Sequence, residues 1–407
     1  MKGPFSIMSF FGITLWIDVG THMVKRDKEK RVDPYNPIRE ISVIVPIHSE
    51  PFEYIEETIK GLYGEKYPIK NVIICGDSES KEVKAKINSV LGNYDSLYYI
   101  RAPVQSKAKK INFIIQNHSN LLGEFVYIRD CRVVGLNNCI EKMISCFVDE
   151  SVAAVTSYGR VRKPSNFLSR SYFYGKDWVN EIGRFRKNAQ EKRKAVFVIC
   201  GASTIFRRKI LSSIPMPVKS KTEDTYYTWI LQEKGFKIMV ADNTMVTAPD
   251  VDGKNLDGIK GQVRQSFRWT SGTMQCMYNE GRKLLKNKRL FYTTILPGFM
   301  EAVSYSIPLV LIPLIFLLSY KFAIGFLIGD MVFSLIGTLV IMPRRFITTL
   351  VHYPQIFFFK YINSMIFIAS LIIVTKQALT GKIQTWSNEW NPPLTKGVMK
   401  KALKNAQ

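Results

Sequence analysis

Short apolar runs alternate with longer mixed stretches over the first two thirds of the chain. Seven such runs are Ile41–Pro46, Asn71–Cys75, Leu97–Ile100, Phe125–Ile128, Val152–Tyr158, Val196–Ile199 and Phe236–Ala241. Val- and Ile-rich runs of this length are typical of strands covered on both faces, as in a mostly parallel sheet. Between the first two runs, Phe52, Ile55, Ile59 and Leu62 follow a Ser-Glu-Pro segment at helical spacing. The pattern therefore predicts βαβ units in an α/β domain from about Ile41 to Trp269.

The chain begins with another apolar run, Phe5–Val19, which is followed by the basic cluster Lys25–Arg31. A cleavable signal peptide has its basic residues before the apolar run. We therefore expect an uncleaved membrane anchor over residues 1–23, with its C-terminal side in the cytoplasm according to the positive-inside rule. An amphipathic helix on the membrane surface is the alternative.

Two long apolar runs follow the α/β region, Pro297–Tyr320 and Phe322–Met342. Each is long enough to cross about 30 Å of hydrocarbon. A third run, Phe346–Val374, contains polar residues and fits either an interfacial helix plus one span or a short hairpin. We therefore expect three or four crossings in all. The basic segment before these runs, 273–291, is expected to lie on an anionic membrane surface.

These patterns predict a multi-pass protein of the cell membrane with its α/β domain in the cytoplasm. Its expected parts are the anchor (1–23), the α/β domain (38–272), the interfacial helix (273–291), the membrane helices (292–376) and a cytoplasmic or peripheral tail (377–407).

The charge of the chain narrows the choice of partners. The formal net charge is +24, from 57 Lys and Arg against 33 Asp and Glu. Such a balance indicates an anionic partner, and both membrane lipids and a phosphorylated substrate fit. The chain carries no helix-turn-helix, zinc or RRM signature, so we expect no nucleic-acid partner. The six cysteines and four histidines are scattered, which argues against disulfides and a zinc site.

Two aspartates directly follow strand runs, at the edge of the sheet where ligands of α/β domains bind. Asp77 follows the second run, where its carboxylate can accept hydrogen bonds from a nucleobase or ribose. An ordinary helix cap is the alternative for this residue. Asp130 ends the run FVYI-R and is suited to a divalent cation that bridges a diphosphate, with a turn aspartate as the alternative.

Two further motifs lie later in the domain. Thr222-Glu223-Asp224 opens a predicted helix, and one of its two carboxylates is suited to act as a general base. Acidic residues are also favourable at any helix N-terminus. Gln265, Arg268 and Trp269 share one face of a second helix, where they offer an amide, a phosphate-binding guanidinium and a ring for stacking on a sugar.

In this order, and followed by apolar helices, these motifs resemble those of the membrane-bound family-2 glycosyltransferases. That group contains the hyaluronan, chitin and cellulose synthases and ceramide glucosyltransferase. The resemblance implies a GT-A-type, Rossmann-like, mostly parallel sheet domain between N-terminal and C-terminal transmembrane helices. It further implies an inverting hexosyltransferase that uses a nucleotide-sugar donor, by analogy a UDP-sugar, and a divalent cation, Mg²⁺ or Mn²⁺.

The resemblance also assigns roles to individual residues. Asp224 corresponds to the catalytic base, with Glu223 beside it, and Asp130 corresponds to the metal-binding aspartate of a DxD motif. The acceptor side is implied for Gly201, in the segment CGASTIFRR, and for Gln265 and Trp269 of the QxxRW motif. The expected donor-binding residues are Pro46, Glu50, Asp77, Lys107, Lys110, Asp130, Arg132 and Arg268. Trp386 is matched to a gating-loop tryptophan.

Two positions depart from the family pattern. His48 stands where the opening loop usually has Asn, and the DxD motif reads Asp130-Cys131-Arg132, so its second carboxylate is missing. We hypothesise that the fixed charge of Arg132 partly replaces the cation at the diphosphate. The favoured acceptor is a growing polysaccharide. A lipid that receives a single sugar is the alternative, and a membrane-tethered, inactive sugar-binding protein is the alternative from another class.

Overall fold

The computed structural model describes residues 31–48, 50, 52–76, 87–90, 92–131, 133–136, 138–161, 167–218, 221–241, 244–247, 256–341 and 346–381. The predicted anchor helix (1–23), Asp77, Arg132 and Trp386 lie outside the described residues.

A seven-stranded sheet forms the centre of the α/β domain. Its strands lie in the order β3 (Leu97–Arg101), β2 (Asn71–Gly76), β1 (Ile41–Pro46), β4 (Phe125–Arg129), β8 (Ser203–Arg207), β6 (Val152–Thr156) and β9 (Lys237–Val240). Only β8 is antiparallel to its neighbours, β4 and β6. The predicted mostly parallel sheet is therefore confirmed. A second, three-stranded sheet contains β5 (Val133–Gly135), β10 (Met245–Thr247) and β7 (Gly159–Val161).

Helices cover both faces of the large sheet, which explains why its strands are apolar on both sides. One face packs against α2 (Phe52–Tyr63) and α5 (Cys139–Ile144). The other packs against α4 (Lys107–Asn117), α7 (Arg208–Ser213) and α8 (Glu223–Glu233). Along β1, Val43 and Val45 belong to the first core and Ile44 belongs to the second. This alternation is the period of two that a strand imposes on its side chains.

One of the predicted strands is wrong. The apolar run Val196–Ile199 is not a strand, and β8 begins only at Ser203. Side chains of neighbouring helices satisfy the backbone of this run: the Nε2 group of Gln232 donates to the Val196 carbonyl oxygen, and Thr228 Oγ1 accepts from the Ile199 N–H group. The run is apolar because Val196 and Ile199 fill the core beside α8, and not because it pairs with another strand.

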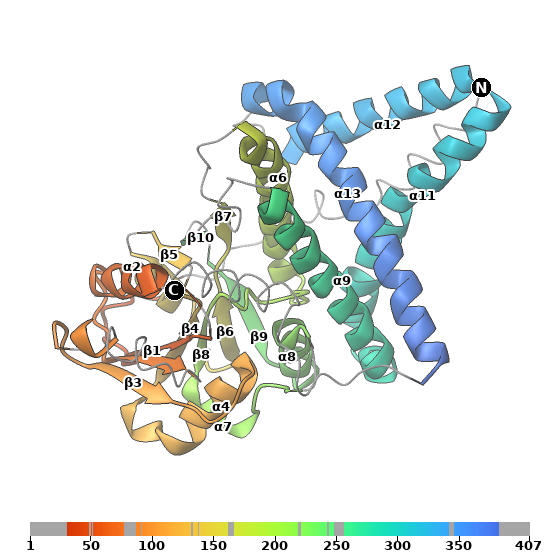
Figure 1. Cartoon of the computed structure of the whole chain (residues 1–407). Coiled ribbons are helices and arrows are strands. Elements are labelled where there is room, and N and C mark those ends of the chain that lie inside the picture. The colour runs from red at the N-terminus through yellow and green to blue at the C-terminus, as the bar shows by residue number, and fades with distance from the viewer. Residues whose placement is uncertain are drawn as a thin grey trace, which may run out of the picture.

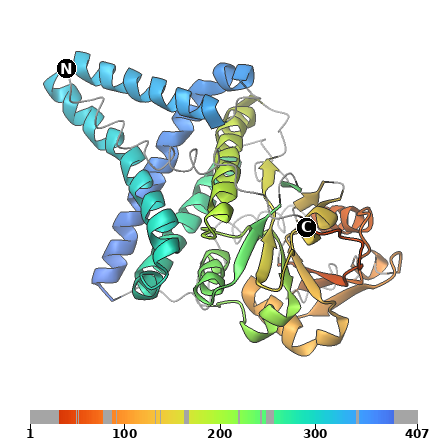
Figure 2. The same cartoon turned by 180° about the vertical axis from the view of Figure 1, so that it is seen from behind.

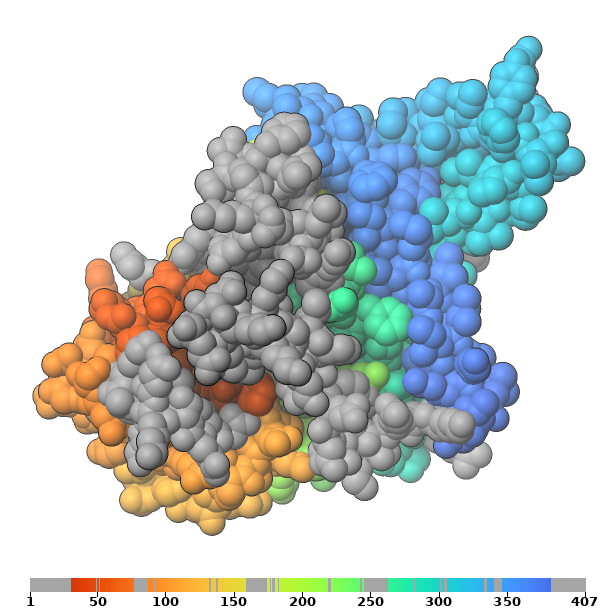
Figure 3. Space-filling model, viewed as in Figure 1, coloured from red at the N-terminus to blue at the C-terminus, as the bar shows by residue number. Residues whose placement is uncertain are grey.

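Five long helices lie beside the sheet or extend away from it. They are α6 (Phe167–Lys192), α9 (Leu256–Leu284), α11 (Leu296–Leu318), α12 (Tyr320–Ile341) and α13 (Phe346–Leu379), with the short α10 (Lys288–Leu290) and η2 (Phe291–Ile295) between α9 and α11. Figures 1 and 2 show α13 running beside α6 and α9, while α11 and α12 diverge from it and meet at a corner. In Figure 3 this corner stands clear of the α/β domain.

By length and composition, two helices in the described part of the chain are able to cross a membrane. They are α12, over Tyr320–Leu339, and α13, over Phe346–Leu379. The predicted span Pro297–Tyr320 corresponds to α11, in which only Ser306–Leu318 forms a shorter apolar stretch. Only the first part of the segment 273–291 continues the motif helix, because α9 runs from Leu256 to Leu284 and a turn precedes α10.

A buried ion pair joins α12 to α13. Lys360 Nζ lies 2.7 and 2.8 Å from the two carboxylate oxygens of Asp330, and the Tyr361 hydroxyl donates to Oδ2 at 2.9 Å. The side chains of Lys360 and Asp330 are only 4% and 10% exposed. Two charges in an apolar setting are tolerated because each is paired and hydrogen-bonded.

We expect removal of one partner to destabilise the protein more than removal of both. Asp330→Leu or Lys360→Met alone leaves an uncompensated buried charge, which costs about 3–5 kcal/mol. The double variant should recover most of that loss. Melting temperatures in detergent measure the effect, with Lys321→Met, an exposed charge at the α11–α12 corner, as the control. A double variant less stable than either single variant would contradict this prediction.

Candidate active site

The candidate site lies where two neighbouring strands and two helices meet. Asp130 follows the end of β4, and Gly201 precedes β8, the antiparallel neighbour of β4. The helices α4 and α8 begin at the same place, with Lys107 and Glu223 as their first residues. Ser106 caps α4 by accepting a hydrogen bond from the Lys109 N–H group at 3.2 Å. The topology thus brings together sequence motifs that are far apart along the chain.

The loop that carries Asp130 is held by three hydrogen-bonding groups. The Asp130 N–H group donates to the Ala202 carbonyl at 3.0 Å, and the Thr58 hydroxyl of α2 donates to the Cys131 carbonyl. The guanidinium group of Arg129 donates twice to the Val133 carbonyl, at 3.1 and 2.9 Å. Arg129 is fully buried. These contacts leave the loop little freedom, so the Asp130 carboxylate is preorganised.

Lys107 connects this loop to the other side of the site. Its ammonium group forms an ion pair with Asp130 and donates to the Gly201 carbonyl at 2.6 Å. Burial opposes the charged form, but the carboxylates of Asp130 and Glu223 outweigh it and raise the pKa of Lys107. Lys107 therefore remains a cation between the three acidic residues of the site.

The two carboxylates of the Thr222-Glu223-Asp224 motif occupy the first turn of α8. Asp224 Oδ1 accepts a hydrogen bond from the Thr225 N–H group at 2.8 Å. Burial, together with the adjacent Asp224 charge, raises the pKa of Glu223 to about 7. Glu223 thus holds its proton more strongly than an ordinary glutamate.

A glycine allows Asp224 to approach the Lys107 side of the site. A Cβ atom on Gly201 would lie 2.9 Å from Asp224 Oδ2 and 3.3 Å from Asp224 Cβ and Cγ. Any side chain here would move the carboxylate. The predicted residues Gly201 and Asp224 are therefore neighbours. A glycine is required at 201 because the Asp224 side chain approaches its backbone closely, and not because the backbone forms a turn that favours glycine.

The Gln265-Arg268-Trp269 face belongs to α9, which passes directly over the start of α8. A Cβ atom on Gly272 would lie 2.8 Å from Thr222 Cγ2 and 2.9 Å from Lys221 Cβ. The Arg268 charge acts electrostatically on both Lys221 and Glu223. Trp269 is 46% exposed. The amide oxygen of Gln265 is buried and has no hydrogen-bond partner within the residues that the structure covers.

Three predicted donor-binding residues lie around the end of β1 and the loop that follows it. Pro46 is buried as its last residue, and Glu50 accepts a hydrogen bond from the His48 N–H group at 2.5 Å. Lys110 is only 1% exposed, and its ammonium group donates to the Ile47 carbonyl at 2.6 Å. The structure therefore places Lys110 beneath the loop after β1, whereas Lys107 faces Asp130.

Sequence reasoning missed four residues of the site: Thr58, Arg129, Lys221 and Gly272. Arg129 could have been found from the sequence, because a charged residue at the end of a buried strand run needs a partner inside the protein. No sequence pattern distinguishes the other three, since a threonine on a helix, a lysine in a loop and a glycine in a helix are all common.

The described residues fit a divalent cation only in part. They contain no group of three His, Cys, Asp or Glu side chains that would hold an ion by themselves. Magnesium, however, is commonly held by one or two carboxylates together with substrate phosphates. Asp130, on a rigid loop, fits the role of the single protein carboxylate in such a site.

A mostly parallel sheet covered on both faces, with an acidic residue after β4 and a carboxylate pair at the start of α8, defines a GT-A glycosyltransferase. The chain belongs to glycosyltransferase family 2: the model described as "Glycosyltransferase like family 2" matches residues 37–272, more than half of the chain. This confirms the resemblance and the enzyme class that the motifs indicated.

Two curated relatives are poly-beta-1,6-N-acetyl-D-glucosamine synthases. The one from Staphylococcus aureus (strain COL) is 25% identical over 241 residues, which cover 58% of this chain and 55% of the relative. The one from Staphylococcus epidermidis is 23% identical over 260 residues, covering 63% and 60%. The matched region therefore spans little more than half the length of these relatives.

A mannosyltransferase from Pyrobaculum calidifontis, solved with GDP-Man and Mn²⁺, shares the fold with a TM-score of 0.59. The similarity covers 93% of this chain and 98% of that one at 15% identity. It therefore extends beyond the α/β domain to the long C-terminal helices, and at this identity it establishes the fold alone.

We expect Gly201→Ala to reduce turnover roughly tenfold or more, because displacement of a catalytic group by a fraction of an ångström is costly. The added methyl group would displace the Asp224 carboxylate. Gly183→Ala is the matched control, since a Cβ atom there meets nothing within 4 Å. Sugar transfer and melting temperature are measured together. Normal turnover in Gly201→Ala would contradict the assigned position of Asp224.

Proposed function

We propose that the protein is an inverting polysaccharide synthase. It transfers a hexose from a UDP-sugar to a growing saccharide at the cytoplasmic face of the cell membrane. The observation that carries the proposal is the convergence of Lys107, Asp130, Gly201 and Asp224 in one site. A cation for a diphosphate and a carboxylate for an acceptor thereby lie side by side.

The names of the relatives support a polymer as product. Both curated relatives are named as synthases of a poly-N-acetylglucosamine. The structural neighbour is a mannosyltransferase that was solved with GDP-Man, so the fold by itself does not select UDP. We favour UDP because of the family motifs. Transfer of one sugar to a lipid acceptor is the second candidate, since the same residues serve both reactions.

The two carboxylates of α8 divide their roles in this mechanism. We assign the general base to Asp224, because it matches the family's base and its carboxylate lies beside Gly201, on the Lys107 side of the site. Asp224 takes the proton from the acceptor hydroxyl as that oxygen forms a bond to the anomeric carbon. The bond from this carbon to the diphosphate oxygen breaks on the opposite face, which inverts the configuration.

The departing diphosphate carries away the electron pair of the broken bond and requires positive charge. Lys107 provides it from a half-buried position, and Arg268 provides it from α9. A divalent cation held by Asp130 and the diphosphate oxygens would add Lewis-acid stabilisation. Gln265 and Trp269 would line the acceptor site, with the ring of Trp269 exposed for stacking on a sugar.

An inactive sugar-binding protein is less consistent with this site. Loss of the second DxD carboxylate is its main support. A binding protein, however, has no use for a glycine that admits the Asp224 carboxylate to a site beside Lys107.

The first test is nucleotide release by the detergent-purified full chain, across UDP- and GDP-sugars with Mg²⁺ or Mn²⁺. We expect release from one UDP-sugar, reduced at least a hundredfold in Asp224→Asn, because the amide cannot accept the hydroxyl proton. Sizing of the product separates a polymer from a glycolipid. Equal release by Asp224→Asn would overturn the proposed base, and absence of release with any donor and acceptor would favour the inactive protein.

The second test concerns the cation. We expect a chelator to reduce turnover and Asp130→Asn to raise the metal concentration needed for half-maximal activity, because Asp130 is the proposed protein ligand. If the Arg132 charge partly replaces the cation, some activity survives in chelator, and this residual activity is lost in Arg132→Ala. Complete loss of activity in chelator together with a silent Arg132→Ala would reject a role for that charge.

A further inference from the structure

One stripe of residues on α9 packs against the catalytic turn of α8. Gly272, Cys276 and Glu280 are four residues apart, so they lie on the same face of the helix. Gly272 has no room for a side chain beside Thr222 and Lys221, and Cys276 Sγ lies 3.6 Å from Thr222 Oγ1. The stripe thus contacts the residues immediately before Glu223 and Asp224.

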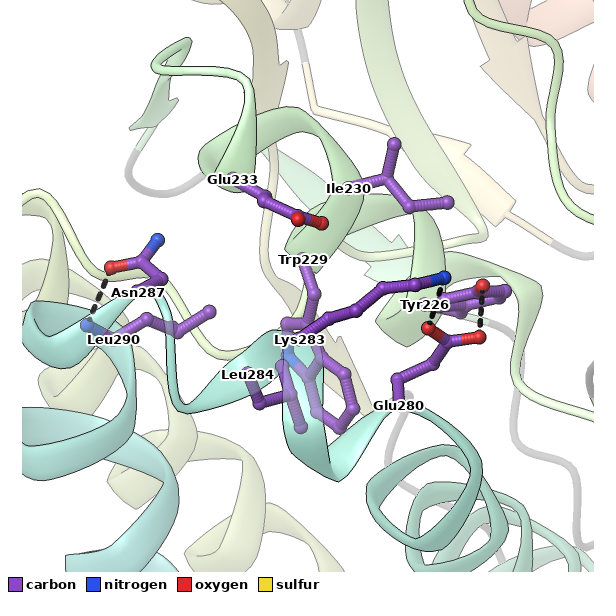
Figure 4. A pocket seen from close by; sticks show the side chains of 9 residues that line it. All are labelled: Tyr226, Trp229, Ile230, Glu233, Glu280, Lys283, Leu284, Asn287 and Leu290. Carbon is purple, nitrogen blue, oxygen red and sulfur yellow. Dashed lines mark hydrogen bonds and ion pairs between the residues drawn. The ribbon is translucent and has the colours of Figure 1, made fainter.

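The third member of the stripe makes a polar contact, which is visible in Figure 4. The Tyr226 hydroxyl donates a hydrogen bond to Glu280 Oε1, and Lys283 Nζ lies 2.7 Å from Glu280 Oε2. The Glu280 side chain is 16% exposed. Burial and the Glu280 carboxylate raise the pKa of Tyr226, so its hydroxyl keeps the donated proton. This is a charge-assisted hydrogen bond with a defined donor and acceptor.

This hydrogen bond joins the two helices that carry the two halves of the candidate site. Tyr226 is two residues after Asp224 on α8, whereas Arg268 and Trp269 lie one turn before Gly272 on α9. The separation between the proposed base and the QxxRW face therefore depends on how α9 lies against α8. Gly272 and Cys276 lie at the close approach of the two helices, and Glu280 links the helices through Tyr226.

We propose that Glu280, acting through Tyr226, is a positioning residue that holds the QxxRW helix in register with the catalytic carboxylates. The proposal rests on the proposed function in one respect, namely that both helices act on the same sugar transfer. The helix α9 also contacts α13, through a 3.1 Å hydrogen bond from Gln275 to Gln377. The contact between Glu280 and Tyr226 therefore also joins the apolar helices to the catalytic turn.

The test compares Tyr226→Phe, Glu280→Gln and the double variant. Tyr226→Phe removes only the hydroxyl, so the fold is retained. We expect each single variant to lose roughly tenfold in kcat with little change in the KM for the donor, because alignment and not ground-state binding is impaired. The double variant should lose no more than the larger of the two single losses, since Glu280→Gln removes the charge that strengthens this hydrogen bond and Tyr226→Phe removes its donor. Glu233→Gln is the matched control. Glu233 lines the same pocket as Tyr226 and Glu280, and its carboxylate forms no hydrogen bond or ion pair with the other residues drawn in Figure 4.

A readout that needs no turnover accompanies the kinetics. Cys276 is buried between the two helices, so the rate of its alkylation, mapped by mass spectrometry, reports separation of α9 from α8. We expect Tyr226→Phe and Glu280→Gln to be labelled several-fold faster than the wild type and Glu233→Gln.

Losses in kcat that multiply in the double variant, a loss confined to KM, or unchanged kcat would each overturn the positioning role. Faster labelling of Cys276 with wild-type kcat would show a purely structural contact. If the wild type turns over no donor, the proposed function fails, and unchanged labelling then rejects the helix contact independently.

Discussion

The ammonium group of Lys107 holds together parts of the chain that reach the site from different directions. It pairs with Asp130 after β4, donates a hydrogen bond to the Gly201 carbonyl before β8, and lies within electrostatic reach of Glu223 on α8. Without this cation, the carboxylates of Asp130, Glu223 and Asp224 would repel one another in a poorly hydrated region. In the proposed mechanism, this same charge stabilises the departing diphosphate.

Buried cations have a second use around the site, which is to hold backbone loops. Arg129 and Lys110 both lie in the interior, and both donate to backbone carbonyl groups near strand ends. A buried donor must find an acceptor, so each of these side chains fixes the loop that supplies it. The rigidity of the Asp130 loop and of the loop after β1 therefore comes from Arg129 and Lys110, whose charged groups are used on backbone carbonyls.

The long helices connect the site to the apolar part of the molecule. The helix α13 packs along both α6 and α9, and the contact with α6 is close, because a Cβ atom on Gly175 would overlap Phe359. The helix α12 is attached to α13 by the Asp330–Lys360 pair. The apolar helices and the start of α8 are thus joined by a continuous chain of contacts through α9.

The sequence by itself determined the enzyme family, the mostly parallel sheet and the presence of apolar helices near the C-terminus. These properties follow from local patterns: strand runs that are apolar on both faces, long apolar runs, and motifs in a fixed order. The residue roles that the motifs suggested stay proposals, although the structure brings Lys107, Asp130, Gly201 and Asp224 together.

Only the tertiary structure decided which apolar runs pair as strands and which polar residues support the site. The run Val196–Ile199 has the composition of a strand, but side chains from α8 satisfy its backbone. The two lysines Lys107 and Lys110 look alike in sequence, yet one faces Asp130 and the other lies beneath the loop after β1. Glu280 is more than fifty residues from Tyr226 along the chain. Such contacts depend on how helices distant in sequence pack, and no local pattern records that packing.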